Sequence, residues 1–191
     1  MKPDNLVTFL RENVEPLKDP TQGDRYRAAA YLSDGTYLPC VVFQSKQARV
    51  ELALRRLKHV CWRRTQYRIV VESFVTGGSR VAEYDLKNVE LSPFAWPIDL
   101  MRTIKGETVM GWTAFVAEMN NGTMHSYGTD FRMEFFDLPK GYTYKDILKI
   151  HSGMVYSQSG GLEKFSMDTA KNAQPLREKP FFTCYLSNLS D

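Results

Sequence analysis

The chain has 191 residues, of which 43% are hydrophobic and 25% charged, and its formal net charge is +3. This composition excludes an intrinsically disordered chain, and the apolar runs are shorter than the roughly 20 residues that a membrane-spanning helix needs. Residues 1–5 lack the pattern of a secretory signal, and the three cysteines are too few and too scattered for a disulfide framework. We therefore expect a soluble, cytoplasmic protein, with residues 1–191 forming a single globular domain.

The first predicted element is a helix that begins at Asn5. Its apolar residues recur at the spacing of one helical face, at Leu6, Phe9, Leu10 and Val14. Asp4 precedes the helix as a candidate N-cap. Pro16 ends it, because proline lacks a backbone N–H and its ring clashes with the preceding turn.

A β-hairpin is predicted next, with strands over residues 26–32 and 37–43. Asp34 and Gly35 predict a two-residue type I′ turn between them, in which Gly35 has a positive φ. Pro39 cannot donate a hydrogen bond to a neighbouring strand. The returning strand is therefore expected to lie at a sheet edge or to carry a bulge at Pro39.

Two more hairpins are predicted further along the chain. One has strands over residues 67–75 and 80–86, with a turn at Gly77–Gly78, and the other joins residues 112–119 to a strand from Met124 through Asn121–Gly122. Short turns join antiparallel strands, because parallel strands need long crossover connections. The hairpins therefore predict antiparallel pairing.

The remaining predicted elements are three helices and a final strand. The helices cover residues 46–60, a segment from Pro97 that stops before Gly106, and a segment from Thr143 that stops near Gly153, where Asp146 completes a variant capping box. Residues 181–186 predict a buried strand. The predicted fold is α+β, with an antiparallel sheet of about six or seven strands built from hairpins and with the helices from Asn5 and Lys46 packed on one face.

A basic segment over residues 46–68 is the most informative feature for function. It carries one acidic residue, Glu51, and eight basic residues: Lys46, Arg49, Arg55, Arg56, Lys58, Arg63, Arg64 and Arg68. On a helical wheel its predicted core face holds Val50, Ala53, Leu54, Leu57 and Cys61. Arg49, Arg56 and Arg63 are spaced by seven residues and would form one stripe.

This segment has three interpretations. It could contact phosphates of a nucleic acid, with aromatic rings nearby for stacking; it could pair with an acidic surface of a partner protein or of a second copy; or it could be a solvated helix face. The candidate residues for nucleic-acid or acidic-partner binding are Arg49, Arg56, His59, Trp62, Arg63 and Arg64.

Catalytic and metal-binding patterns are weak in this sequence. It contains no GxxxxGK[ST] loop, no GxSxG turn, no HExxH pair and no CxxC pair, so we assign no catalytic residue, no metal and no cofactor. The carboxylates Asp130 and Glu134 lie four residues apart. A hydrolase or nuclease would need them to converge with another acid such as Glu118 around a divalent ion.

The segment Pro93–Pro97 places two aromatic residues, Phe94 and Trp96, between prolines. A stiff loop of this kind is a candidate protein-interaction ridge, although both rings could equally fill the end of the core. Because the sequence contains none of the catalytic motifs above, we favour a non-catalytic binding protein that acts through a partner protein or by self-association. The alternatives are a nucleic-acid-binding domain that uses residues 46–68, and a hydrolase or nuclease with a carboxylate site.

Overall fold

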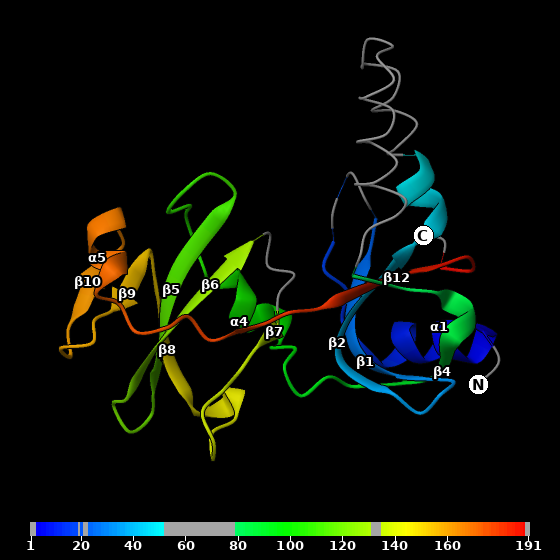
Figure 1. Ribbon diagram of the computed structural model, residues 1–191, viewed down its shortest axis with the longest axis horizontal. Coiled ribbons are helices and arrows are strands. Elements are labelled where there is room, and N and C mark those ends of the chain that lie inside the picture. The colour runs from blue at the N-terminus through cyan, green and yellow to red at the C-terminus, as the bar shows by residue number, and fades with distance from the viewer. Residues whose placement is uncertain (1–2, 19, 21–22, 52–78, 131–134, 190–191) are drawn as a thin grey trace, which may run out of the picture. The chain divides into compact units, whose positions relative to one another are not determined.

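A computed structural model describes residues 3–18, 20, 23–51, 79–130 and 135–189. The chain divides into two compact units (Figure 1). The first unit consists of Met1–Pro93 together with Phe181–Asp191, and the second is Phe94–Pro180. A single domain over residues 1–191 stays a prediction. No helix in the described ranges is long and apolar enough to cross a membrane.

The first unit is built on a mixed five-stranded sheet with the order β3-β12-β2-β1-β4. The last strand of the chain, β12, pairs in parallel with both β2 and β3, whereas β1 pairs antiparallel with β2 and β4. The strands are β1 Arg25–Leu32, β2 Tyr37–Ser45, β3 Arg80–Val81, β4 Leu86–Glu90 and β12 Phe182–Leu186.

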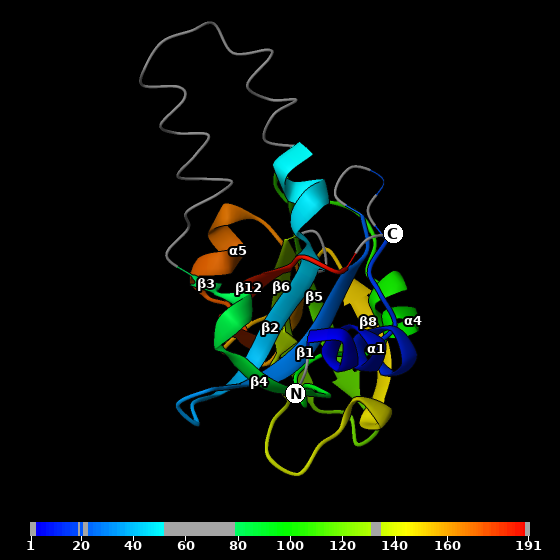
Figure 2. The same ribbon diagram turned by 90° about the vertical axis from the view of Figure 1, so that its right-hand side faces the viewer.

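Helix α1, Pro3–Asn13, supplies the apolar layer that covers one face of this sheet (Figure 2). Leu6, Leu10 and Val14 are buried, as their spacing predicts. They belong to one hydrophobic cluster with sheet residues that include Phe43 and Cys184. The predicted N-terminal helix is therefore confirmed, together with the face that it buries.

The predicted first hairpin is confirmed in its strands, but its turn is longer than expected. The backbone N–H of Leu32 donates to the carbonyl of Thr36 at 2.9 Å, so residues 33–35 form the loop. Gly35 has a φ of 90° and its N–H donates to the carbonyl of Leu32 at 3.0 Å. This arrangement is the three-residue type, in which a β-turn is followed by a residue in the left-handed region. The two-residue turn was therefore wrong, although the positive φ of Gly35 is confirmed.

We expect the substitution Gly35→Val to destabilise the protein by about 1–3 kcal/mol, because a β-branched residue is strained at a positive φ. No atom lies within 4 Å of the position that a Cβ on Gly35 would occupy, so the cost comes from the backbone and not from a clash. Gly35→Asn is the matched control, since asparagine tolerates the left-handed region. Thermal unfolding should rank the three proteins as wild type, then Asn, then Val. Equal melting temperatures for the Val and Asn variants would contradict the turn assignment.

A bulge occurs at Pro39, as its missing N–H predicts. Ala28 pairs with Val41 and Ala30 pairs with Leu38, so both Pro39 and Cys40 lie opposite the single residue Ala29. The bulge lets proline sit inside a long strand, because the ladder is already interrupted there.

The second unit contains a three-stranded antiparallel sheet with the order β6-β5-β8, and two smaller two-stranded sheets. The third predicted hairpin, β5 and β6, is confirmed. The α-helices of this unit are short. The α-helices and strands described in it are α4 Ile98–Arg102, β5 Trp112–Met119, β6 Met124–Asp130, β7 Phe135–Phe136, β8 Ile147–Ser152, β9 Met154–Tyr156, β10 Leu162–Lys164, α5 Met167–Lys171 and β11 Glu178–Lys179.

Aromatic rings form the core of the second unit. Trp96 lies with its ring centroid 4.9 Å from Tyr127 and 4.8 Å from Phe136, and Phe115 completes the group at 6.0 Å from Trp96. All four side chains are almost completely buried. The T-shaped and tilted arrangements match the preference of aromatic quadrupoles for edge contacts.

Three fold predictions need correction. The single antiparallel sheet of six or seven strands is wrong, since the largest sheet has five strands and includes parallel pairs. The helices from Asn5 and Lys46 are not packed on one face, because α1 covers the face that carries Phe43 and Cys184, whereas Arg49 lies over Tyr185 of the other face. The helix predicted from Thr143 is only a 3-10 turn at Tyr144–Asp146. Its capping box is present, but the chain then pairs with β5 as strand β8.

Only the second strand of the second predicted hairpin lies within the described residues. Residues 67–78 lie outside the described residues. Residues 80–86, predicted as one strand, divide into β3, a 3-10 turn at Glu83–Asp85 and the start of β4. The final strand at residues 181–186 is confirmed as β12, with Cys184 and Leu186 buried.

Candidate functional site

The register of the first sheet gathers cationic side chains on the face opposite α1. Arg27 pairs with Val42, Val42 with Thr183, and Thr183 with Arg80. Paired residues on neighbouring strands point to the same side of a sheet, so Arg27 and Arg80 share this face. By the same reasoning Arg25, Gln44 and Tyr185 form an adjacent row on it.

A helical turn at residues 46–51 adds two more cations beside this face. It begins directly after β2, where the Ser45 hydroxyl accepts a hydrogen bond from the backbone N–H of Ala48 at 3.2 Å. The Arg49 guanidinium carbon lies 5.7 Å from the ring centroid of Tyr185, and that of Arg80 lies 5.0 Å from it. Both distances are within the range of a cation–π interaction.

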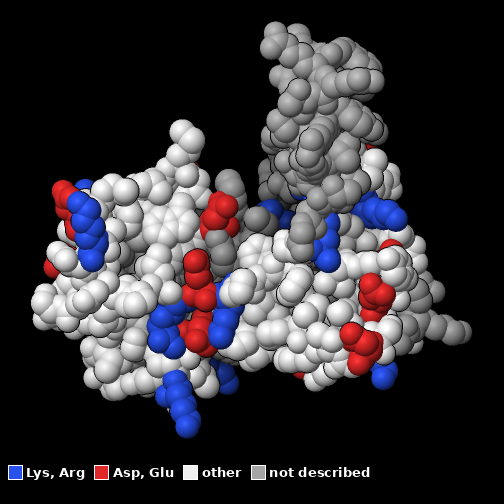
Figure 3. Space-filling model, in the orientation of Figure 1, with Lys and Arg blue, Asp and Glu red and all other residues white. Residues whose placement is uncertain are grey.

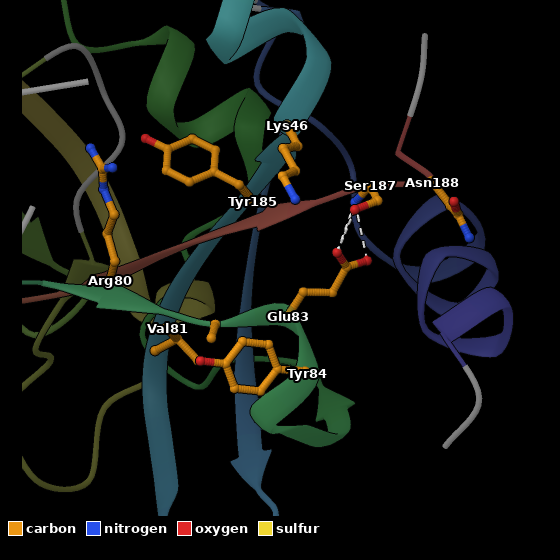
Figure 4. Close-up of a pocket in the computed structure, with 9 residues that line it drawn as sticks. Lys46, Arg80, Val81, Glu83, Tyr84, Tyr185, Ser187 and Asn188 are labelled. Carbon is orange, nitrogen blue, oxygen red and sulfur yellow. Dashed lines mark hydrogen bonds between the residues drawn. The ribbon is translucent and has the colours of Figure 1, made fainter. Parts of the chain in front are cut away.

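A groove of about 670 Å³ opens beside Tyr185 in the first unit (Figure 4). Lys46 and Arg80 lie on either side of Tyr185 in this view. Tyr84, which lines the groove, is 85% exposed. The complete lining is Lys46, Arg80, Val81, Ala82, Glu83, Tyr84, Tyr185, Ser187 and Asn188.

Glu83 is the acidic side chain in this lining, and it is held against the end of β12. Its carboxylate accepts hydrogen bonds from the backbone N–H of Ser187 at 3.0 and 3.1 Å and from the Ser187 hydroxyl at 2.7 Å. These donors partly compensate its negative charge and fix its position. The lining of the groove therefore carries charges of both signs, with Lys46 and Arg80 as its cations and an anchored carboxylate beside Ser187.

No protein-family model, curated protein or solved structure matches this chain. The groove and its charges are therefore the basis for a functional proposal.

Of the predicted basic site, the structure describes Arg49 and places it beside Tyr185. Arg56, His59, Trp62, Arg63 and Arg64 lie outside the described residues. Val50 was predicted on the core face of this helix, yet it is 47% exposed. The predicted helical phase is therefore wrong at its first turn, because Arg49 rather than Val50 packs toward the sheet.

Arg80 and Tyr185 were not predicted as site residues. They lie far apart in the sequence, and Tyr185 reaches Arg49 only because β12 inserts between β2 and β3. The sequence holds no local signal for that insertion. The charge of Arg80 alone would not distinguish it from other surface arginines.

The predicted interaction loop is mostly a core element. Trp96 is 1% exposed in the aromatic cluster of the second unit, so a partner could not contact its ring without unfolding the cluster. Phe94 is half-buried, and the Lys179 ammonium lies 4.8 Å from its ring centroid. The alternative interpretation, in which this segment fills the end of the core, fits Trp96.

The predicted carboxylate site does not form from the described residues. Asp130 pairs with Trp112 at one end of the β5–β6 ladder, and Glu118 pairs with Met124 at the other. At about 3.4 Å per residue, these acids lie roughly 20 Å apart. Glu134 is outside the described residues. Within the described ranges, no group of three His, Cys, Asp or Glu side chains is placed to hold a metal ion.

The second unit contains a histidine–carboxylate pair that the sequence did not predict. His151 Nε2 lies 2.7 Å from Glu118 Oε2, with both side chains mostly buried. His151 pairs with Val116 and Lys149 pairs with Glu118 across β5 and β8. The pair is therefore a cross-strand contact, and finding it requires the register that the sequence analysis lacked.

Figure 3 shows basic and acidic side chains side by side on parts of the second unit. Asp137 lies 3.5 Å from the Arg177 guanidinium and 3.6 Å from the Lys179 ammonium, and Lys171 lies 2.9 Å from Asp168. Cys184, in β12 of the first unit, is unsuited to nucleophilic chemistry, because burial raises the pKa of its thiol to about 12.

His125 should make the stability of the protein depend on pH. Its Nε2 is buried and has no hydrogen-bond partner among the described residues. Burial, followed by the positive charge of Arg177, lowers its pKa below the ordinary value of 6.5. The unfolded chain then binds this proton more readily than the folded chain, so the free energy of unfolding should fall as the pH drops below about 6.5.

The variant His125→Gln isolates this effect, because glutamine cannot be protonated. We expect the difference in melting temperature between wild type and variant to change between pH 7.5 and pH 5, with wild type losing more stability. A difference that stays constant over this pH range would contradict the burial of a neutral imidazole.

Proposed function

We propose that this protein is a non-catalytic binding protein that holds a segment of a partner protein in the groove of its first unit. The proposal is supported above all by the composition of the groove, which joins an exposed aromatic ring and apolar walls to charges of both signs. Tyr84, Val81 and Ala82 supply the apolar surface, and Lys46 and Glu83 supply opposite charges. Peptide segments combine the same features, whereas a small polar metabolite would not use the exposed ring.

Tyr84 offers a direct test. An exposed tyrosine contributes little to folding but can contribute much to binding. Tyr84→Ala should therefore leave the melting temperature nearly unchanged and abolish binding of the partner protein. Tagged wild type and the variant would be used in parallel to isolate proteins from an extract of the source cells. Tyr144→Ala is the matched control, because Tyr144 is also exposed but belongs to the second unit. A partner retained equally by wild type and Tyr84→Ala would contradict the proposal.

Nucleic-acid binding is a second candidate, favoured by a separate observation. Lys46 and Arg49 begin the basic segment, and the guanidiniums of Arg49 and Arg80 lie over the same Tyr185 ring. Glu83 argues against this candidate, because a phosphate chain along the groove would pass close to its carboxylate.

Salt dependence distinguishes the two candidates. If Arg49, Arg56 and Arg63 each contact a phosphate, the slope of log affinity against log salt should be about −2 to −3, and replacing all three by glutamine should flatten it. A partner protein held through the groove predicts no measurable binding of random DNA or RNA at physiological salt. Equal affinity of the triple variant and wild type for DNA and RNA would eliminate the phosphate role.

A further inference from the structure

Asn121 is the only asparagine in the sequence that is followed by glycine. Such a pair is chemically labile, because glycine has no side chain that would hinder its nitrogen from attacking the asparagine amide. The Gly122 nitrogen gives up its proton and bonds to Cγ of Asn121, the Cγ–Nδ2 bond breaks, and ammonia leaves with that proton. Water then opens the resulting succinimide ring and leaves either aspartate or isoaspartate at position 121.

The folded hairpin holds the attacking nitrogen in another contact. Residues 120–122 form the loop between β5 and β6, since the backbone N–H of Met119 donates to the carbonyl of Thr123 at 2.8 Å. The Gly122 N–H, whose proton the reaction must remove, donates to the carbonyl of Met119 at 2.9 Å. Closure of the succinimide ring therefore requires this turn to open.

The Asn121 amide is held at both of its polar atoms. Its Oδ1 accepts hydrogen bonds from the hydroxyl of Thr123 at 2.8 Å and from the backbone N–H of Thr123 at 3.1 Å. Its Nδ2, the nitrogen that would leave as ammonia, donates to the hydroxyl oxygen of Tyr142 at 2.6 Å. The amide has to rotate out of these bonds before its Cγ can approach the Gly122 nitrogen.

Tyr142 is itself fixed by the second unit. Its ring packs against the aromatic core of that unit, and its backbone N–H donates to the carbonyl of Pro139 at 3.1 Å. Asp146 holds the residue beside the reactive pair, because its carbonyl accepts the backbone N–H of Asn120 at 2.8 Å. These contacts clamp the tip of the hairpin, even though Asn121 is exposed to water.

We propose that Asn121 is a site of spontaneous deamidation that the fold protects, with the Tyr142 hydroxyl as the restraint on its amide. The site belongs to the second unit and does not depend on the groove. Conversion to isoaspartate would lengthen the backbone of the loop by a methylene group, so the pairing of Met119 with Thr123 would lose its geometry. An opening of this turn would then leave a lasting change in the hairpin.

The rate of conversion at Asn121 tests the proposal in the full chain. The protein is incubated at mildly alkaline pH, and peptide mass spectrometry follows aspartate and isoaspartate at position 121. Folded wild type should react at least about tenfold more slowly than wild type in urea, because several hydrogen bonds must break together before the ring can close. Tyr142→Phe should speed the reaction of the folded protein about two- to tenfold, the effect of losing one hydrogen bond.

Two controls separate the hydroxyl of Tyr142 from the stability of the second unit. Tyr144→Phe removes the hydroxyl of an exposed tyrosine two positions away and should leave the rate unchanged. Val116→Ala shortens a completely buried side chain of β5 and should lower the stability of the unit. It should nevertheless leave the rate in the folded protein unchanged. All variants are compared well below their melting temperatures.

The proposal fails if either the protection or the role of Tyr142 is missing. Equal rates in the folded protein and in urea would show that the fold does not protect Asn121. An absence of conversion in urea would show that the pair is not reactive. A rate for Tyr142→Phe that equals that of wild type, or that Val116→Ala matches, would show that the hydroxyl is not the restraint.

Discussion

Replacing Trp96 with alanine should lower the free energy of unfolding by about 3–5 kcal/mol, the cost of removing a large aromatic side chain from a packed core. Trp96 is 1% exposed and its ring touches those of Phe115, Tyr127 and Phe136. The remaining rings cannot close the space that it leaves, because each is already held by contacts with the others. Urea and thermal unfolding followed by circular dichroism would measure the loss.

Phe94→Ala is the matched comparison for this change. Phe94 belongs to the same Pro93–Pro97 segment but is half-buried, and its ring contacts the Lys179 ammonium at 4.8 Å. We expect this variant to lose only about 1 kcal/mol. Similar losses for the two variants would mean that Trp96 is not a core residue. A stable Trp96→Ala protein that has lost its partner would restore the interaction-ridge interpretation of this segment.

Gly128→Ala should destabilise the second unit by about 1–3 kcal/mol through overpacking. A Cβ on Gly128 would overlap the six-membered ring of Trp112, which lies directly over this glycine. The ring is also held from another side, with the centroid of Phe165 at 5.4 Å. The tryptophan therefore cannot move away without losing a second contact.

A double-mutant cycle tests this cause directly. In a Trp112→Leu background the smaller side chain leaves room for the new methyl group, so Gly128→Ala should cost much less there. Gly122→Ala shows the cost of backbone strain without a clash, because Gly122 has a positive φ and open space around it. An equal cost of Gly128→Ala in both backgrounds would show that the glycine is needed for its backbone and not for the ring.

The features that could be predicted from the sequence are those that short stretches of chain specify. The hairpin of β5 and β6 follows from Asn121–Gly122 between two apolar strands, and α1 follows from the spacing of its buried leucines. The bulge at Pro39 follows from the chemistry of one residue. In each case the residues that determine the structure lie within a few positions of one another.

The features that could not be predicted depend on pairing between distant segments. Residues 147–152 form a strand because β5 offers them a partner, and a capping box at Thr143 predicts a helix when that partner is unknown. β12 was predicted as a strand, but nothing in residues 182–186 indicates that it runs parallel to β2. Tertiary pairing overrides local propensity in both cases.

The candidate site also combines a feature that a short stretch of sequence indicates with features that depend on pairing between distant segments. The basic segment begins with Lys46, which lines the groove, and contains Arg49, which lies beside Tyr185. The groove itself requires Arg80 and Tyr185 to meet, and that depends on the parallel pairing of β12 with β3. A charge pattern can thus indicate one wall of a binding site, whereas the opposite wall depends on the topology of the sheet.

The position of β12 also affects the order in which the protein acquires its structure during synthesis. The second unit is one continuous stretch, Phe94–Pro180, so it can fold as soon as that stretch has left the ribosome. The sheet of the first unit lacks the strand between β2 and β3 until Phe182–Leu186 has been made. Until then β2 has an unpaired edge, which is a site for pairing with other chains. A nascent chain stalled before residue 182 should therefore depend on chaperones far more than the finished protein does.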